Sequence, residues 1–155
     1  MATVTPDYAL YLLMRKDMDS LNHAGKMVAQ GAHAANHAAA SIGQGKFGPV
    51  AMAAFAEWEK STPQGFGTTL VVSSIVDRYG CRRALQLTDI TMIVENAVSY
   101  GVPAGVTNDP TYPLFDGGTT HAFSCSTCGW VFGARKDIAP FVGNLTLQPA
   151  DPKAH

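Results

Sequence analysis

Four side chains able to bind an anion share one face of a helix that we predict over the alanine-rich residues 24–41. The four, each three or four positions from the next, are Lys26, Gln30, His33 and His37. At about 100° per residue they fall within a wedge of about 60°. This stripe holds no carboxylate to pair with the lysine, so it suits a phosphate or a developing oxyanion. An ordinary solvated helix face is the alternative.

Two groups of residues have spacings that can hold a metal ion. The two histidines of the stripe are four positions apart, but the pattern supplies no third ligand. His121, Cys125 and Cys128 form an H-x3-C-x2-C pattern, which is half of a strong zinc signal, and the fourth ligand would be Cys81 or another distant residue. The alternative is three free thiols in a reducing compartment. We expect no metal and no cofactor.

Composition limits the class of protein. The chain has 155 residues, a net charge of −1, 15% charged residues and 46% hydrophobic residues, which excludes a disordered chain and fits one domain. The near-zero charge argues against coating nucleic acid through bulk charge, but it allows a local basic patch. The apolar run over residues 8–14 is far shorter than the ~20 residues of a membrane span. It follows Asp7 rather than a basic segment, so we expect a cytoplasmic protein.

Predicted strands and helices alternate along the chain. The predicted strands cover residues 7–15, 68–76, 103–107 and one or two segments within 119–132. The predicted helices cover residues 24–41, 49–60, 80–100 (interrupted near 88–89) and 136–143. We expect a turn over residues 108–113 and a loose tail over residues 149–155. The alternation predicts an α/β fold with a mixed, mostly parallel sheet.

The segment over residues 14–38 resembles the signature of the type II peptidyl-tRNA hydrolases. In that family a first strand ends in an Arg and an Asp, and a short loop leads to a Gly-Lys-x-x-x-Gln-x-x-His-Ala helix. The matching residues are Arg15, Asp17, Gly25, Lys26, Gln30, His33 and Ala34. A weaker resemblance extends over residues 8–148 and places Asp109 at the end of a short strand. It implies a single-domain, three-layer α/β/α fold over residues 1–155, with a small sheet of four to five strands.

The family hydrolyses the ester between a peptide and tRNA, without a metal, which recycles the tRNA. The resemblance implies that Asp109 positions or deprotonates a water and that Lys26 stabilises the developing negative charge. Thr127 or Cys128 would orient the water or the substrate, and both stay open because this strand departs from the family's Gly-Thr-x-Thr. From the residues alone, Asp109 in an Asn-Asp-Pro sequence is also typical of a turn.

A tRNA partner would bind mainly through its phosphates. The predicted substrate-binding residues are Arg15, Lys16, Gln30, His33 and Thr111. Further basic candidates are Lys46, Arg135 and Lys136. Arg78, Arg82 and Arg83 also cluster, where we expect a helix to start. That is the unfavourable end for cations, which favours binding of an anion or a partner there. Family members are often homodimers. The second interpretation is a relative that binds tRNA or a protein without turnover, because residues 109–111 and 126–128 read Asp-Pro-Thr and Ser-Thr-Cys.

Overall fold

The structure is a computed structural model that describes residues 6–115 and 117–147, so the predicted tail over residues 149–155 lies outside it. In this part of the chain, six strands and four α-helices form an α/β fold. The strands are β1 (Tyr8–Met14), β2 (Thr68–Val76), β3 (Arg82–Ala84), β4 (Ala104–Phe115), β5 (Thr120–Ala134) and β6 (Leu145–Leu147). The helices are α1 (Ala24–Gly43), α2 (Gly48–Lys60), α3 (Leu87–Ser99) and α4 (Arg135–Val142), with a short 3-10 turn, η1, at Asp19–Asn22.

The sheet is mixed, with the strand order β3-β2-β1-β5-β4, and β6 pairs with β2. Among the described strands only β1 and β2 run parallel, and every other pair is antiparallel. The prediction of a mostly parallel sheet is therefore wrong. Consecutive strands β2–β3 and β4–β5 pair as hairpins, which forces antiparallel pairing, whereas a helical crossover joins β1 to β2.

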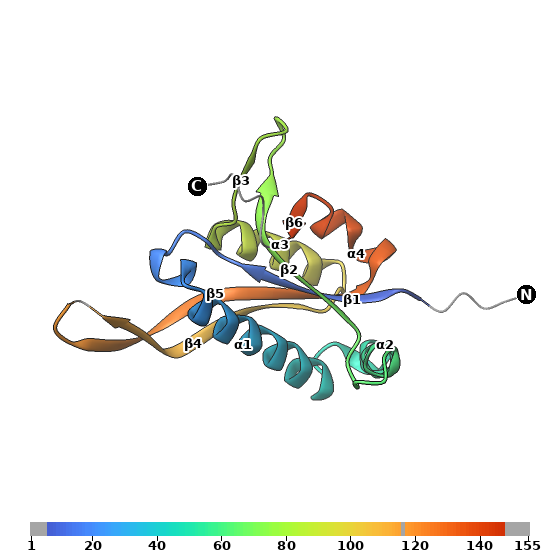
Figure 1. Cartoon of the computed structure of the whole chain (residues 1–155). Coiled ribbons are helices and arrows are strands. Elements are labelled where there is room, and N and C mark those ends of the chain that lie inside the picture. Colours follow the sequence, from blue (N-terminus) through green and yellow to red (C-terminus); the bar gives the residue numbers. More distant parts are fainter. Residues whose placement is uncertain (1–5, 116, 148–155) are drawn as a thin grey trace, which may run out of the picture.

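Helices cover both faces of this sheet (Figure 1). On one face, α1 and α2 pack on a core that includes Trp58, Trp130 and Phe132. On the other face, α3 and α4 enclose a second core, around Ile90 and Ile138. Successive strand residues alternate between the two cores, as the pleat requires. None of the helices in the described ranges combines the length and apolarity that a membrane crossing requires.

The helix predicted over residues 80–100 does not include residues 80–86. Arg82–Ala84 pair with β2 as β3, and α3 begins only at Leu87. A capping box fixes this start, because the side chains of Gln86 and Asp89 each accept from the other's backbone N–H. The cluster of Arg78, Arg82 and Arg83 thus lies on a hairpin rather than at a helix start.

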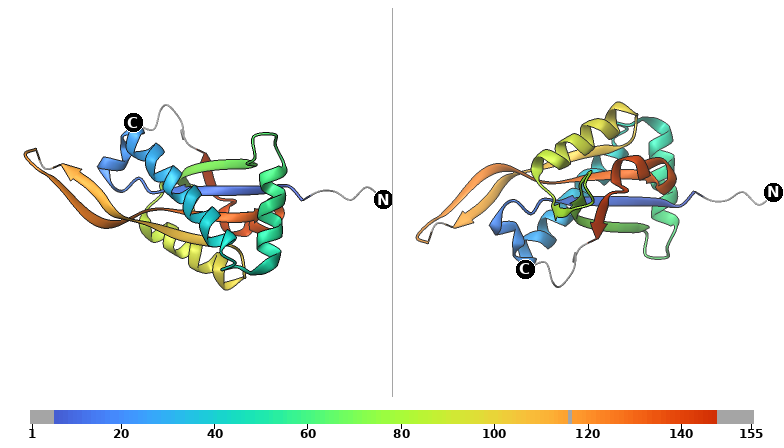
Figure 2. Two further views of the ribbon diagram at one scale, coloured as in Figure 1. Left: turned by 90° about the horizontal axis from the view of Figure 1, so that it is seen from below. Right: turned by 90° about the horizontal axis from the view of Figure 1, so that it is seen from above.

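Strands β4 and β5 continue beyond the sheet as a two-stranded ribbon that projects from the body (Figures 1 and 2). The predicted turn over residues 108–113 is wrong, because these residues belong to β4. Its prolines are tolerated because β4 is an edge strand. The pairing of β4 with β5 is irregular between Thr107 and Asn108, and again between Asp109 and Tyr112. These irregularities turn side chains of the ribbon's base toward α1.

Candidate active site

A buried carboxylate, Asp109, lies where β4 passes α1. Its side chain is 8% exposed. Gln30 Nε2 donates a hydrogen bond to Asp109 Oδ2 at 2.8 Å, and the backbone N–H of Thr111 donates to Oδ1 at 3.0 Å. His33, one turn after Gln30 on α1, places its Nδ1 3.7 Å from Oδ2, and its side chain is 48% exposed. The helix therefore holds the carboxylate from one side and connects it to solvent through His33.

These contacts set the charge of Asp109. Burial alone would raise the pKa of this carboxyl, but the hydrogen bonds from Gln30 and Thr111 and the proximity of His33 lower the pKa below its ordinary value. Asp109 is therefore ionised at neutral pH. A carboxylate with a lowered pKa is a weak base, so this site suits orienting a water better than deprotonating it.

The hydroxyl of Thr127 and the thiol of Cys128 both face α1. Thr127 Oγ donates to Gln30 Oε1, and Cys128 Sγ contacts the backbone carbonyl of Gln30 at 3.2 Å. The pairing of β4 with β5 skips Thr127, which is how adjacent residues can turn to the same side. Burial raises the pKa of the Cys128 thiol, so it stays neutral and is a poor nucleophile. Thr127 thus belongs to the polar chain Thr127–Gln30–Asp109, and Cys128 packs beneath it.

Lys26 lies one turn before Gln30 on α1, against the base of the ribbon. Its Nζ donates to the backbone carbonyl of Pro113 at 2.7 Å and stands 4.9 Å from the centre of the Tyr112 ring. Tyr112 is fully buried and follows Asp109 on β4. An ammonium has three donors, of which the Pro113 carbonyl takes one. Lys26 thus contacts β4 from α1, and Asp109 contacts α1 from β4, so both lie where these two elements meet.

Arg15 follows β1 and links it to Asp17 in the next loop and to Ser126 in β5. Its guanidinium donates to both carboxylate oxygens of Asp17 at 2.6 and 2.9 Å and to the carbonyl of Ser126 at 2.8 Å. The Arg15 side chain is only 12% exposed. Its contact with Ser126 positions β5 next to Thr127. Lys16 comes next, and its backbone N–H bonds to the carbonyl of Leu85.

His37 is the member of the predicted stripe that makes a separate contact, away from Asp109. Trp130 Nε1 donates to His37 Nδ1 at 3.2 Å, and Thr107 Oγ lies 2.9 Å from the same nitrogen. An indole N–H can only donate, so His37 Nδ1 is an unprotonated acceptor. Burial, together with Lys46 nearby, lowers the pKa of His37. This neutral histidine anchors α1 to the sheet, a role that helix spacing alone does not reveal.

The structure does not bring together the residues of the alternative zinc pattern. His121 and Cys128 lie on one continuous strand, seven residues apart, or about 23 Å at ~3.3 Å per residue. Cys81 is exposed and precedes β3, at the other edge of the sheet. Within the described residues, no group of three His, Cys, Asp or Glu side chains could hold a metal ion.

Two further features lie away from Asp109. Arg135 forms an ion pair with Asp7 at 3.0 Å, next to the start of β1.

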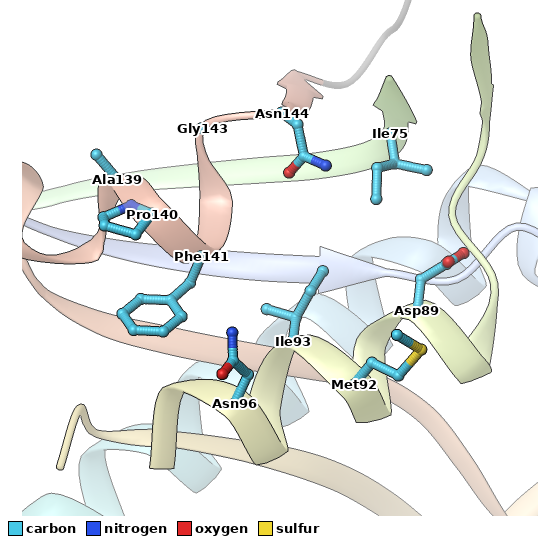
Figure 3. A pocket seen from close by; sticks show the side chains of 10 residues that line it. All are labelled: Ile75, Asp89, Met92, Ile93, Asn96, Ala139, Pro140, Phe141, Gly143 and Asn144. Carbon is cyan, nitrogen blue, oxygen red and sulfur yellow. The ribbon is translucent and has the colours of Figure 1, made fainter. Parts of the chain in front are cut away.

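A hollow of about 380 Å³ opens between α3, α4 and β2, on the other face of the sheet (Figure 3). Met92 and Phe141 line it, with the amides of Asn96 and Asn144. The sequence carries no motif that predicts this hollow.

The predicted site residues therefore fall into two groups. Those that share one contact network are Gln30, His33, Asp109, Thr111, Thr127 and Cys128. Lys26 lies beside them, whereas Arg15 and Lys16 occupy the end of β1. Comparison of the chain with protein-family models gives no match, and no curated protein matches it either.

Proposed function

We propose that the protein hydrolyses the ester that joins a peptide, or an N-blocked aminoacyl group, to tRNA, and so recycles the tRNA. The observation that carries the proposal is the ionised, buried Asp109, held by Gln30, with Lys26 one helical turn before Gln30 on α1. Ester hydrolysis needs an acceptor that orients the attacking water and a cation for the charge on the carbonyl oxygen. Asp109 and Lys26 supply these two groups from β4 and α1.

The chemistry follows from these roles. A water that donates to Asp109 adds to the carbonyl carbon of the ester, and the negative charge falls on the carbonyl oxygen beside Lys26. The bond to the ribose 3′ oxygen then breaks, and that oxygen takes up a proton to become a hydroxyl. The proton released by the water passes to solvent at the half-exposed His33, 3.7 Å from Asp109. Thr127 supports the site through Gln30, and Thr111 holds the second carboxylate oxygen.

Helices on both faces of the sheet support a single three-layer α/β/α domain, the fold that the resemblance implies. The substrate, peptidyl-tRNA, places the activity in the cytoplasm. The acceptor end of the tRNA would lie along the exposed side of α1, next to Lys26 and His33.

The test measures ester cleavage on N-acetyl-aminoacyl-tRNA. We expect turnover by the wild type and a loss of about 100-fold or more in Lys26→Ala, the magnitude seen when one oxyanion donor is removed. Asp109→Asn should lose a comparable factor, because an amide orients the water less well. The matched control is Lys60→Ala, an exposed lysine at the end of α2, which should keep full activity. No turnover by folded wild type would refute the enzyme, and equal turnover by Lys26→Ala would refute the site.

A second candidate is a relative that binds tRNA without turnover. The observation that favours it is the 2.7 Å bond from Lys26 to the Pro113 carbonyl, which ties the lysine to the ribbon. This candidate predicts that folded wild type binds deacylated tRNA yet leaves the ester intact. The same reaction series therefore separates the two candidates.

A further inference from the structure

The turn between β2 and β3 concentrates positive charge in a chain that has little. Arg78, Arg82 and Arg83 are three of the 11 lysines and arginines in the sequence, and all three are exposed. The hairpin that carries them projects from the sheet beyond α3 (Figure 1). The function proposed for Asp109 and Lys26 makes no use of this hairpin.

Its backbone is held in one shape by a single side chain. Asp77 Oδ1 accepts hydrogen bonds from the backbone N–H groups of Tyr79 and Cys81, both at 2.9 Å. The Asp77 N–H bonds to the Cys81 carbonyl at 2.9 Å, and Gly80 supplies the left-handed residue at φ +80°. The tip is therefore ordered before any ligand arrives, which reduces the entropy cost of binding.

The arginines have different roles. Arg83 makes two hydrogen bonds to the Asp89 carboxylate, at 2.7 and 2.6 Å, and so anchors β3 to α3. Arg78 instead lies with its guanidinium carbon 4.8 Å from the centre of the Tyr79 ring, and this tyrosine is 75% exposed. Arg82 precedes Arg83 on β3 and is exposed. The tip thus offers a guanidinium over an exposed aromatic ring, together with the charges of Arg78 and Arg82.

This combination fits RNA better than an acidic protein. Phosphates take up arginine charge, and an unpaired base stacks on an exposed aromatic ring or a guanidinium plane. The hairpin and the candidate site lie at the same end of the sheet. The carboxyl ends of β1 and β2 lie at the same end of the sheet because these strands are parallel. The backbone N–H of Lys16, just after β1, donates to the carbonyl of Leu85, just after β3, at 2.8 Å. Four strand spacings of ~4.8 Å separate β3 from β4, or about 19 Å, a span that one tRNA can bridge.

We propose that the turn over residues 77–82 is a second RNA contact, in which Arg78 and Arg82 bind phosphates and Tyr79 stacks on an unpaired base. The identity of that RNA as the tRNA whose acceptor end occupies the site rests on the proposed function. The contact itself is independent of ester hydrolysis, so it can be tested with tRNA that carries no ester.

The binding experiment uses full-length protein and fluorescently labelled deacylated tRNA, titrated over a series of salt concentrations. Arg78→Ala and Arg82→Ala should each weaken binding and lower the slope of log K against log salt by about 0.7–0.9, the value for one phosphate contact. Tyr79→Ala should raise Kd about tenfold, within the range for one stacked base, whereas Tyr79→Phe keeps the ring and the affinity. Lys60→Ala is the matched loss of one charge and should change neither quantity.

Each outcome decides the inference. Unchanged Kd and salt slope in all three alanine variants would overturn it, and so would binding of the hairpin to acidic vesicles in place of tRNA. Urea unfolding of each variant checks that the fold is retained. A minimal ester, N-acetyl-aminoacyl-adenosine, separates this inference from the proposed function. If the wild type binds tRNA through the hairpin but cleaves no ester, the proposed function is refuted and the RNA contact is retained. If the wild type cleaves the ester while the hairpin variants bind tRNA normally, only the RNA contact is refuted.

Discussion

Replacing Gln30 by methionine tests the polar chain at the centre of the candidate site. Gln30 is 3% exposed and bonds on one side to the Asp109 carboxylate and on the other to Thr127. A hydrogen bond to a charged group contributes about 1.5–3 kcal/mol, and one between neutral groups about 0.5–1.5 kcal/mol. Methionine fills a similar volume, so the cavity contribution is small. We therefore expect Gln30→Met to lower the free energy of unfolding by about 2–4.5 kcal/mol at neutral pH.

The stability lost in Gln30→Met must also depend on pH, and the direction of that dependence follows from the pKa of Asp109. In the folded protein the hydrogen bonds, that of Gln30 among them, lower the pKa of Asp109 below its unfolded value, which is about 3.9. That stabilisation is fully present above the unfolded pKa and is lost as the pH falls through the folded pKa. The difference between wild type and Gln30→Met should therefore be largest near pH 7 and shrink below about pH 4.

Urea unfolding followed by circular dichroism measures both quantities, and an unchanged m-value confirms that the denatured state is the same. The control is Gln64→Met in the exposed loop after α2, which should change stability by less than about 0.5 kcal/mol. A difference below about 1 kcal/mol for Gln30→Met at neutral pH, or one of equal size at every pH, would refute the proposed chain from Thr127 to Asp109.

Two further predictions concern packing and thiol reactivity. Gly129→Ala should lower stability by about 1–3 kcal/mol in thermal unfolding, because its Cβ would lie 2.6 Å from Ile90 Cγ2. The control is Gly25→Ala in the first turn of α1, where an added Cβ meets nothing within 4 Å. It should raise stability by about 0.4–1 kcal/mol. A larger loss of stability in Gly25→Ala than in Gly129→Ala would contradict the packing of β5 on α3. With a thiol reagent, the exposed Cys81 should react first and the buried Cys128, whose pKa burial raises, only on unfolding; equal rates in folded protein would show that the site opens.

Residue propensity and spacing predicted β2 and α1, because each of these elements is determined largely by its own residues. The strand over residues 68–76 matches β2 at both ends, because a β-branched run between glycine-rich turns favours an extended chain. The alanine-rich α1 ends two residues later than predicted, which is ordinary variation at a helix end. The contact of Gln30 and His33 with Asp109 agrees with the stripe on α1, since helix spacing fixes which side chains share a face.

Features that depend on pairing between distant segments were not predicted. The Asn-Asp-Pro sequence before Thr111 is typical of a turn, yet pairing with β5 keeps it extended at an edge of the sheet. The irregular pairing at Thr127 likewise has no signal in its own sequence, so the contacts of Thr127 and Cys128 with Gln30 could not be predicted. The arginines of residues 78–83 lie on a hairpin because β3 pairs with β2, a contact that helix and strand propensities do not encode.

The edge position of β4 has a consequence for the behaviour of the protein in solution. A long exposed edge strand invites strands from other molecules, and natural proteins discourage this with proline and with irregular pairing. Pro110 and Pro113 remove two N–H donors from β4, and its pairing with β5 is interrupted near both. The strand that carries Asp109 is therefore a poor template for aggregation, and a second copy of the chain would not extend the sheet through β4.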